Sequence, residues 1–176
     1  MARFDAEAQG SERSTDSTRS RVTLSQPVYI DTSALAKRYQ REAGSDEFDR
    51  FLGRFRAVSI SRLTVVEFRC LLARRRRNRE LDAQAERRAA AAFDEDIARG
   101  FLEVHPLEDR HALDAYDLLM KLRAIPLRTL DALHLAIALA MGAHTIATAD
   151  DTFSAAAAAL RLNAKWFGRA RRDGER

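Results

Sequence analysis

Four acidic residues stand where a carboxylate is costly unless it has a chemical role. Asp31 and Asp150 each follow a short apolar segment that is predicted to be a strand. Glu67 and Asp131 lie instead among apolar residues at helical spacing. Burying an ionised carboxylate is unfavourable unless it is paired or binds a metal ion. The four acids together therefore predict a shared site for a divalent cation, and the inferred reaction is phosphodiester cleavage.

The chemistry of the ligands indicates which cation. Two carboxylates about 4 Å apart repel by roughly 4 kcal/mol at an effective dielectric near 20, and a dication removes that conflict. An all-oxygen ligand set favours Mg²⁺, with Mn²⁺ as the alternative. The single cysteine, Cys70, excludes an internal disulfide and a cysteine-based zinc site, and we expect it to be a small core residue.

Each acid also has a structural interpretation when it is taken alone. Asp131 suits the first turn of a helix, where the helix dipole favours a negative charge. Asp31 and Asp150 could be loop or N-cap residues, and Glu67 could pair with an arginine. These separate interpretations do not explain why acids recur at strand ends and within apolar helical faces. Metal ligation explains all four.

Short apolar strands alternate with helices along the chain. Strands are predicted over 28–30, 57–60, 101–105, 143–148 and 162–167, and helices over 33–39, from about 45, and over 61–79, 82–100, 107–122, 130–141 and 152–160. This alternation predicts an α/β fold with three layers, in which helices cover both faces of a parallel sheet of four to five strands. Ligands of such sheets bind beyond the carboxyl ends of the strands, so Asp31, Asp131 and Asp150 are expected in one crevice.

The predicted helix 61–79 is apolar on two sides. One side carries Leu63, Val66, Glu67 and Cys70, and the opposite side carries Val65, Phe68 and Leu72. Such a helix is expected to lie between the sheet and either another helix or another subunit. It is followed by an alanine-rich helix, and the two form a predicted hairpin with apolar surface for a protein partner, through Phe68 and Leu72.

Length and composition set the domain organisation. The 176 residues suit one domain, predicted over 27–167, with a polar, disordered extension over 1–26 and a basic tail over 168–176. No apolar run approaches the roughly 20 residues of a membrane span, and we expect a cytoplasmic protein without membrane contact. The net charge of +4 is compatible with a polyanionic partner.

Basic residues that could meet RNA are harder to assign. The run from Arg74 to Arg77 is predicted to spread around its helix, because consecutive helical residues turn by about 100°. Arg62, Arg69 and Arg76, seven residues apart, form a better stripe on one face, although a solvated helix face is the structural interpretation. Lys37 and Arg38 follow the first strand closely and are better placed to meet phosphate. The four histidines share no ligand spacing, and we interpret them as core or surface residues. His134, one turn after Asp131, is the one to watch.

Four segments resemble, in order, the four motifs of PIN-domain ribonucleases. They read YIDTSAL over Tyr29–Leu35, SRLTVVE over Ser61–Glu67, TLDALHLA over Thr129–Ala136 and IATADDTF over Ile146–Phe153. The resemblance covers about residues 27 to 167, and it is closest to VapC-type toxins of bacterial toxin–antitoxin pairs. The set of four motifs is much more specific than any one of them.

The resemblance implies roles for individual residues. Asp31, Asp131 and Asp150 would form the acidic metal site, with Glu67 as a ligand or as support for the ligands. The hydroxyl groups of Thr32, Ser33 and Thr148 would orient these acids or their waters. Asp151 adjoins Asp150 and could replace it, but Phe153 three positions later matches the apolar residue of the motif and favours Asp150.

The same resemblance implies a Mg²⁺-dependent endoribonuclease toxin that inhibits translation by cutting tRNA or ribosomal RNA. It also implies a homodimer that binds a cognate antitoxin. The alternative is a catalytically inactive PIN-fold module that binds RNA or protein. Loss of one of the motif acids would favour this alternative, and all four acids are present.

Overall fold

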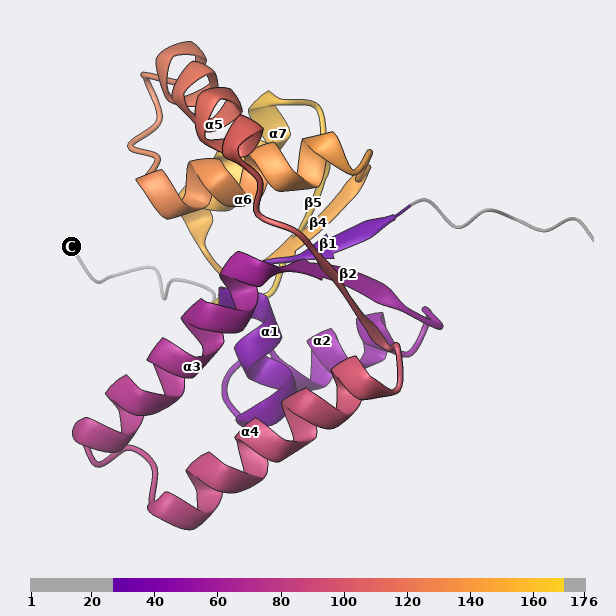
Figure 1. Ribbon diagram of the computed structural model, residues 1–176, viewed down its shortest axis with the longest axis vertical. Coiled ribbons are helices and arrows are strands. Elements are labelled where there is room, and N and C mark those ends of the chain that lie inside the picture. Colours follow the sequence, from indigo (N-terminus) through magenta and orange to yellow (C-terminus); the bar gives the residue numbers. More distant parts are fainter. Residues whose placement is uncertain (1–26, 170–176) are drawn as a thin grey trace, which may run out of the picture.

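The computed structural model describes residues 27–169 and contains five strands and seven helices in that range (Figure 1). The strands are β1 (Val28–Ile30), β2 (Val58–Ser61), β3 (Leu102–His105), β4 (Thr145–Thr148) and β5 (Asn163–Trp166). The helices are α1 (Thr32–Tyr39), α2 (Ser45–Leu52), α3 (Arg62–Arg77), α4 (Ala83–Ala98), α5 (Asp109–Lys121), α6 (Thr129–Ala140) and α7 (Asp151–Ala159). Every predicted element is present, with small differences at the ends. The predicted extension 1–26 and most of the predicted tail 168–176 lie outside the described residues.

Side-chain caps fix where the helices begin. Asp31, Ser61 and Asp150 each accept a hydrogen bond from a main-chain N–H in the first turn of α1, α3 and α7, respectively. Such caps satisfy donors that the helix itself leaves without a partner. Two of the four motif acids therefore also anchor the helices that follow β1 and β4.

All five strands are parallel, in the order β3-β2-β1-β4-β5. The chain builds outward from β1 to β3 and then crosses back to build β4 and β5 on the other side of β1. The order reverses between β1 and β4, and such a switch point opens a crevice at the carboxyl ends of the strands. The N–H of Asp31 donates to the carbonyl oxygen of Ala147 at 3.0 Å. The ends of β1 and β4 therefore lie side by side.

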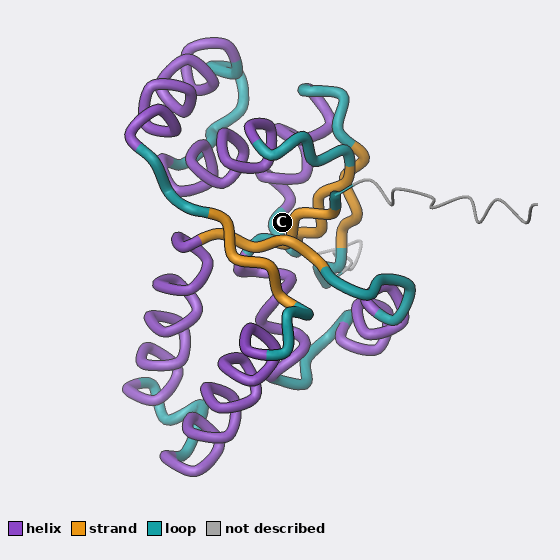
Figure 2. The backbone as a smooth tube through the Cα atoms, turned by 45° about the vertical axis from the view of Figure 1, so that its right-hand side comes forward, coloured by secondary structure: helices purple, strands orange, loops and turns teal. Residues whose placement is uncertain are grey.

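The sheet separates two hydrophobic cores. Helices α1 to α4 cover one face, and α5 to α7 cover the other (Figures 1 and 2). Alternate residues of a strand point to opposite faces, so Val28 and Ile30 join the first core and Tyr29 joins the second. This is the predicted three-layer α/β/α arrangement.

Beyond its first turn, where Leu63 joins the second core, helix α3 buries its apolar residues on one side, contrary to the prediction. Phe68 and Leu72 are 0% and 1% exposed, and the ring of Phe68 lies 4.6 Å from that of Phe93 on α4. Val66 and Cys70 are exposed. The predicted partner surface through Phe68 and Leu72 is therefore wrong, because α4 already covers it, and Cys70 is not a core residue.

Exposed apolar residues gather instead on α5. Leu113, Tyr116 and Met120 follow one another at steps of three and four, and all three are more than half exposed. This stripe faces away from the core that Ala115 and Leu118 join on the same helix. Within residues 27–169, no helix is both long enough and apolar enough to cross a membrane.

Candidate active site

The four motif acids line one cavity of about 660 Å³ at the carboxyl ends of β1 and β4. Asp31 follows β1 and Asp150 follows β4 after one residue. Asp131 lies in the first turn of α6, and Glu67 lies near the middle of α3. Four elements that are distant in the sequence therefore bring their carboxylates to one crevice, which is the arrangement that the strand-end argument predicts.

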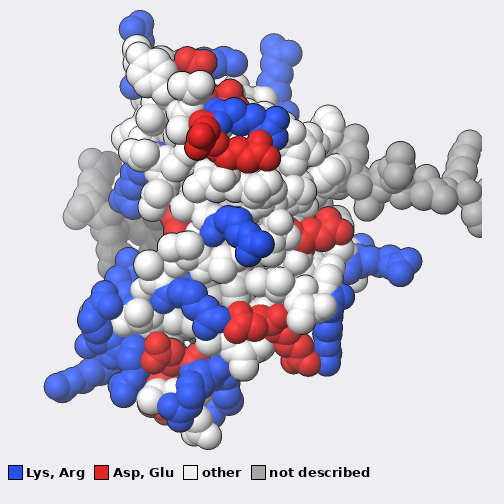
Figure 3. Space-filling view, viewed as in Figure 1, with Lys and Arg blue, Asp and Glu red and all other residues white. Residues whose placement is uncertain are grey.

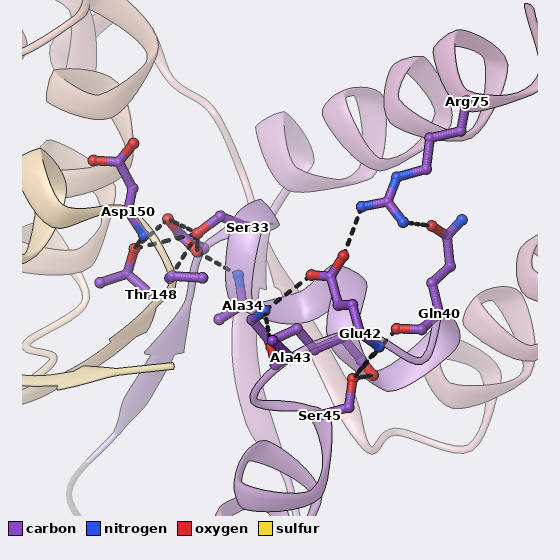
Figure 4. Close-up of polar contacts among 12 residues, drawn as sticks. Ser33, Ala34, Gln40, Glu42, Ala43, Ser45, Arg75, Thr148 and Asp150 are labelled. Carbon is purple, nitrogen blue, oxygen red and sulfur yellow. Dashed lines mark hydrogen bonds and ion pairs between the residues drawn. The ribbon is translucent and has the colours of Figure 1, made fainter. Parts of the chain in front are cut away.

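Asp31 is the most deeply held of the four. Its side chain is 5% exposed and accepts hydrogen bonds from the N–H of Ala34 at 2.9 Å and from the hydroxyls of Ser33 and Thr148, each at 2.8 Å (Figure 4). Burial raises the pKa of this carboxyl, although the hydrogen bonds act in the opposite direction. A buried acid with a raised pKa is one whose charge a nearby cation would stabilise.

Asp131 and Asp150 are each held through one oxygen. The N–H of Arg128 donates to Oδ2 of Asp131 at 3.3 Å, and the N–H of Phe153 donates to Oδ1 of Asp150 at 2.8 Å. Burial and the negative charge of Asp150 both raise the pKa of Asp131. The second oxygen of each carboxylate accepts no hydrogen bond from the residues that the structure describes. Asp151 is exposed and does not line the cavity.

Glu67 is also held through a single oxygen. Both the Thr32 hydroxyl and Nε2 of His134 contact Oε2, the latter at 2.7 Å. Oε1 has no hydrogen-bond partner among residues 27–169. Burial works to raise the pKa of Glu67, but the hydrogen bond and charge of His134, together with Thr32, hold it below its usual value. Glu67 therefore remains an anion with one oxygen available.

These acids fit a hard divalent cation by their chemistry. Three of them keep one carboxylate oxygen without a protein donor, and oxygen ligands are those that Mg²⁺ and Mn²⁺ prefer. In the described part of the chain, no three His, Cys, Asp or Glu side chains are already arranged to hold one ion. The acids line a common wall, and Asp131 and Asp150, each held by one hydrogen bond, have more freedom to reorient their free oxygens than Glu67.

The same cavity has a basic wall. Arg74, Arg77, Arg128 and Arg169 line it, and none of them forms an ion pair within residues 27–169. Blue side chains gather over the ends of α3 and α4 at the lower left of Figure 3. Arg76, in the same run, does not line this cavity, which agrees with the predicted spread of Arg74 to Arg77 around the helix. Long arginine side chains reach the crevice from more than one side of the helix axis.

Lys37 and Arg38 are engaged within the protein. Lys37 is 4% exposed and its Nζ contacts Glu42 at 2.9 Å and the carbonyl oxygen of Ala43 at 2.7 Å. Arg75 reaches the same glutamate from α3 at 2.9 Å (Figure 4). Arg38 binds Asp96 on α4 at 2.7 Å. The sequence places both residues near the crevice, but their charges already have partners.

Two further residues, His134 and Tyr29, support Glu67 at this site. His134 is buried, and its two ring nitrogens contact Glu67 and Tyr29. The three-residue step from Asp131 to His134 places both side chains on neighbouring faces of α6, and that spacing was the available signal. Tyr29 precedes Asp31 by two residues, and its position inside a strand suggested only a core role.

A profile of the family described as PIN domain matches residues 28–159. The chain belongs to the PIN domain family. This assignment covers all four acids and agrees with the sheet order and the strand-end crevice. A search of curated protein sequences found no matching relative.

Several solved structures are similar to this chain in fold. The VapC20 toxin of Mycobacterium tuberculosis, described as cleaving the sarcin–ricin loop, is 23% identical, with a TM-score of 0.60 over 73% of this chain and 94% of that one. FitAB bound to a DNA fragment is 16% identical, with a TM-score of 0.62 over 83% and 99% of the two chains. DNA-bound VapBC of Salmonella typhimurium is 18% identical, with a TM-score of 0.56 over 81% and 98%. At these identities the likeness establishes the fold.

Proposed function

We propose that this PIN domain protein is a Mg²⁺-dependent endoribonuclease and the toxin of a VapBC-type toxin–antitoxin pair. The observation that carries the proposal is the convergence of Asp31, Glu67, Asp131 and Asp150 on one cavity. Three of these carboxylates keep an oxygen without a protein donor, a pattern suited to ligands rather than to structural acids. The positions match the acids of the family motifs one by one.

Each residue of the crevice has a defined part in this reaction. Asp31, Asp131 and Asp150 would hold the ion, with Glu67 as a further ligand or as support. A bound Mg²⁺ would supply a water of lowered pKa and positive charge opposite the phosphate. Oδ2 of Asp131 accepts from the N–H of Arg128, so Oδ1 is the oxygen that would bind the ion. The products would carry a 5′-phosphate and a 3′-hydroxyl.

Hydroxyl groups around the acids would keep them in position. Ser33 and Thr148 donate to Asp31, and the Thr148 hydroxyl also accepts from the N–H of Asp150 at 3.0 Å. Thr32 donates to Glu67. We therefore assign Thr32, Ser33 and Thr148 to orientation of the carboxylates.

The basic wall is proposed to hold the RNA backbone. Arg74 and Arg77 follow Glu67 on α3 by seven and ten residues, which corresponds to about 10 and 15 Å along the helix axis. That spacing would place both arginines along the RNA backbone on the same side of a scissile bond near Glu67. We place the RNA contacts on these arginines rather than on Lys37 and Arg38, whose charges are occupied by Glu42 and Asp96.

The substrate and the antitoxin follow from the proposed class of toxin. A structured RNA of translation, either tRNA or ribosomal RNA, is the proposed target, and its cleavage in the cytoplasm would inhibit translation. Among the similar structures, VapC20 is a toxin that cleaves the sarcin–ricin loop, and VapBC and FitAB were solved bound to DNA. By the same logic, a cognate antitoxin would bind this protein and suppress its activity.

A homodimer is proposed through α5. The stripe formed by Leu113, Tyr116 and Met120 is the longest run of exposed apolar side chains on one helix of the described chain. Exposed apolar patches mark protein interfaces. Tyr116→Asp should convert a dimer to a monomer in light scattering, while Asp117→Asn on the same helix should not. A monomeric wild type at high concentration would exclude this dimer.

The decisive experiment measures cleavage of RNA by the purified full-length chain. Cleavage should require Mg²⁺ or Mn²⁺, stop when EDTA is added and be absent in Asp31→Asn. Sequencing the cleavage ends in cellular RNA after brief expression would identify the target. Binding of RNA without cleavage by the wild type, equal to that of Asp31→Asn, would favour the inactive binding module instead.

A further inference from the structure

We infer that His134, held by Tyr29, is a positioning residue that fixes Glu67 with Oε1 turned toward the crevice. This inference rests on the proposed nuclease function for its catalytic consequence. It assigns a role to a buried histidine outside the four motif acids. The contacts that support it can be followed from α6 to β1 and then to α3.

The first contact sets the orientation of Glu67. Nε2 of His134 lies 2.7 Å from Oε2 of Glu67, and a carboxylate can only accept, so Nε2 carries the hydrogen of this bond. The Thr32 hydroxyl donates to the same oxygen. Two donors on Oε2 prevent the carboxylate from rotating freely. The oxygen without a protein donor, Oε1, is therefore presented in a defined direction.

The second contact sets the orientation of His134 itself. Nδ1 lies 2.6 Å from the hydroxyl of Tyr29, which donates in turn to the hydroxyl of Ser61 at 2.9 Å. Tyr29 is fully buried and His134 is 3% exposed. The imidazole is further enclosed by Phe153, whose ring centroid lies 6.3 Å away. The ring therefore has one orientation, and that orientation is aimed at Glu67.

The contacts form a closed circuit on α3. Ser61 caps the start of α3 by accepting from the N–H of Thr64 at 3.2 Å, and Glu67 lies almost two turns after Ser61 on the same helix. The circuit leaves α3 at Ser61, passes through Tyr29 and His134, and returns to α3 at Glu67. A shift of α3 relative to β1 or α6 would break at least one of these bonds. The circuit thus ties the position of Glu67 to the sheet that carries Asp31.

A purely structural histidine would join α6 to β1 through Tyr29 without any need for the second contact. The second nitrogen instead reaches a half-buried carboxylate at the crevice, whose pKa is lowered partly by this bond. Partners that orient catalytic or metal-binding groups change affinity or activity by about 10- to 100-fold when they are removed. A loss of activity of this size, beyond any loss of stability, would distinguish a positioning role for His134 from a packing role.

Two substitutions separate the two contacts of the ring. The side-chain amide of Gln can replace Nε2, so His134→Gln keeps a donor to Glu67 and loses the bond to Tyr29. The shorter amide of Asn replaces Nδ1, so His134→Asn keeps the partner of Tyr29 and loses the donor to Glu67. Both variants remove the same ring from the same core, so their comparison controls for stability.

The experiment compares steady-state cleavage of RNA by the full-length variants, together with their melting temperatures. His134→Asn should lower kcat by about 10- to 100-fold with little change in KM, and His134→Gln should retain most of the activity. Tyr29→Phe, which touches no acid, should lower kcat by less than His134→Asn. Equal losses in the Gln and Asn variants, in proportion to their melting temperatures, would overturn the inference.

A second measurement does not depend on cleavage. The proton on Nε2 of His134 should give a slowly exchanging ring N–H signal in NMR spectra, identified by its absence in His134→Gln. In Glu67→Ala this signal should shift strongly and exchange faster with water. An unchanged signal would show that His134 does not hold Glu67. If the wild type cleaves no RNA, the proposed function fails, but this result still decides the positioning role.

Discussion

The acidic and basic sides of the crevice are held in different ways. Among the acids, Asp31 accepts three hydrogen bonds from nearby donors, and Glu67 accepts two on a single oxygen. On the basic side, Arg74 and Arg77 are exposed and form no ion pair with any described residue. Groups that act on the scissile bond must be fixed before substrate arrives, whereas groups that grip a flexible backbone can adapt. The difference predicts distinct kinetic signatures for the two sides.

Loss of a central acid should have the largest effect. Asp31→Asn or Asp131→Asn should reduce cleavage by at least about 100-fold, the scale of losing one preorganised charged group. The pKa of both acids is raised by burial, so each ionised side chain costs stability at neutral pH, and that cost grows as pH rises through the raised pKa. The Asn variants should therefore melt higher than wild type without metal ions.

The metal dependence of melting tests the same acids in a second way. Mn²⁺ should raise the melting temperature of wild type, because a ligand that binds only the folded state stabilises it. The shift should largely vanish in Asp31→Asn. Full cleavage by Asp131→Asn, or an equal shift in both proteins, would place the ion elsewhere.

Substitutions of the two neighbouring acids after β4, Asp150 and Asp151, should differ in their effect on cleavage. Asp150→Asn should lower cleavage by about tenfold or more, because its free oxygen faces the cavity, while Asp151→Asn should stay within about twofold. Asparagine is also a good N-cap, so the cap on Phe153 and the start of α7 should survive in the first variant. Cleavage rates of the two variants, compared once their melting temperatures have been shown to agree, decide whether Asp150 or Asp151 belongs to the site.

Arginine variants should affect binding more than the chemical step. Arg74→Gln and Arg77→Gln should each raise KM several-fold and leave kcat nearly unchanged. Each should also reduce the slope of log affinity against log salt by about 0.7, the value for one phosphate contact with a single strand. Arg69→Gln is the matched control, because Arg69 lies on the same helix, pairs with Asp94 at 2.6 Å and does not line the cavity. Equal effects at all three positions would argue against the basic wall.

Chemical labelling of Cys70 tests whether RNA passes through the cavity, and its expected effect is the smallest. Cys70 is the only cysteine of the chain, it is exposed, and it lines the cavity between Glu67 and Arg74 on α3. A maleimide should label it in the native protein, and bound RNA should slow that reaction severalfold. Labelling that RNA does not slow would show that the strand takes another path.

The sequence predicted the fold and the placement of the acids because their determinants are local. The alternation of apolar strands and helices, and the position of an acid just after a strand, can both be counted along the chain. Asp31 and Asp150 are examples, since each also begins the next helix as its cap. A parallel sheet then brings strand ends together without further information.

Other features depended on contacts that periodicity does not specify. The two apolar sides of α3 were equivalent in the sequence, and only packing against α4 shows that Phe68 is internal and that Cys70 faces the crevice. The arginine run is spread around its helix, and only the length of the side chains lets both Arg74 and Arg77 reach the cavity. His134 was recognisable by spacing, but its link to Tyr29 joins residues 105 positions apart.

The pairing of β1 with β4 also determines when the crevice can exist during synthesis of the chain. The hydrogen bond between Thr148 and Asp31 joins residues 117 positions apart. A chain that ends before Thr145 contains β1, β2 and β3 but lacks Asp150 and the hydroxyl that orients Asp31. Pairing between distant parallel strands must wait until both have been made. The complete acid set therefore assembles only after most of the chain has been translated, and prematurely terminated products lack it.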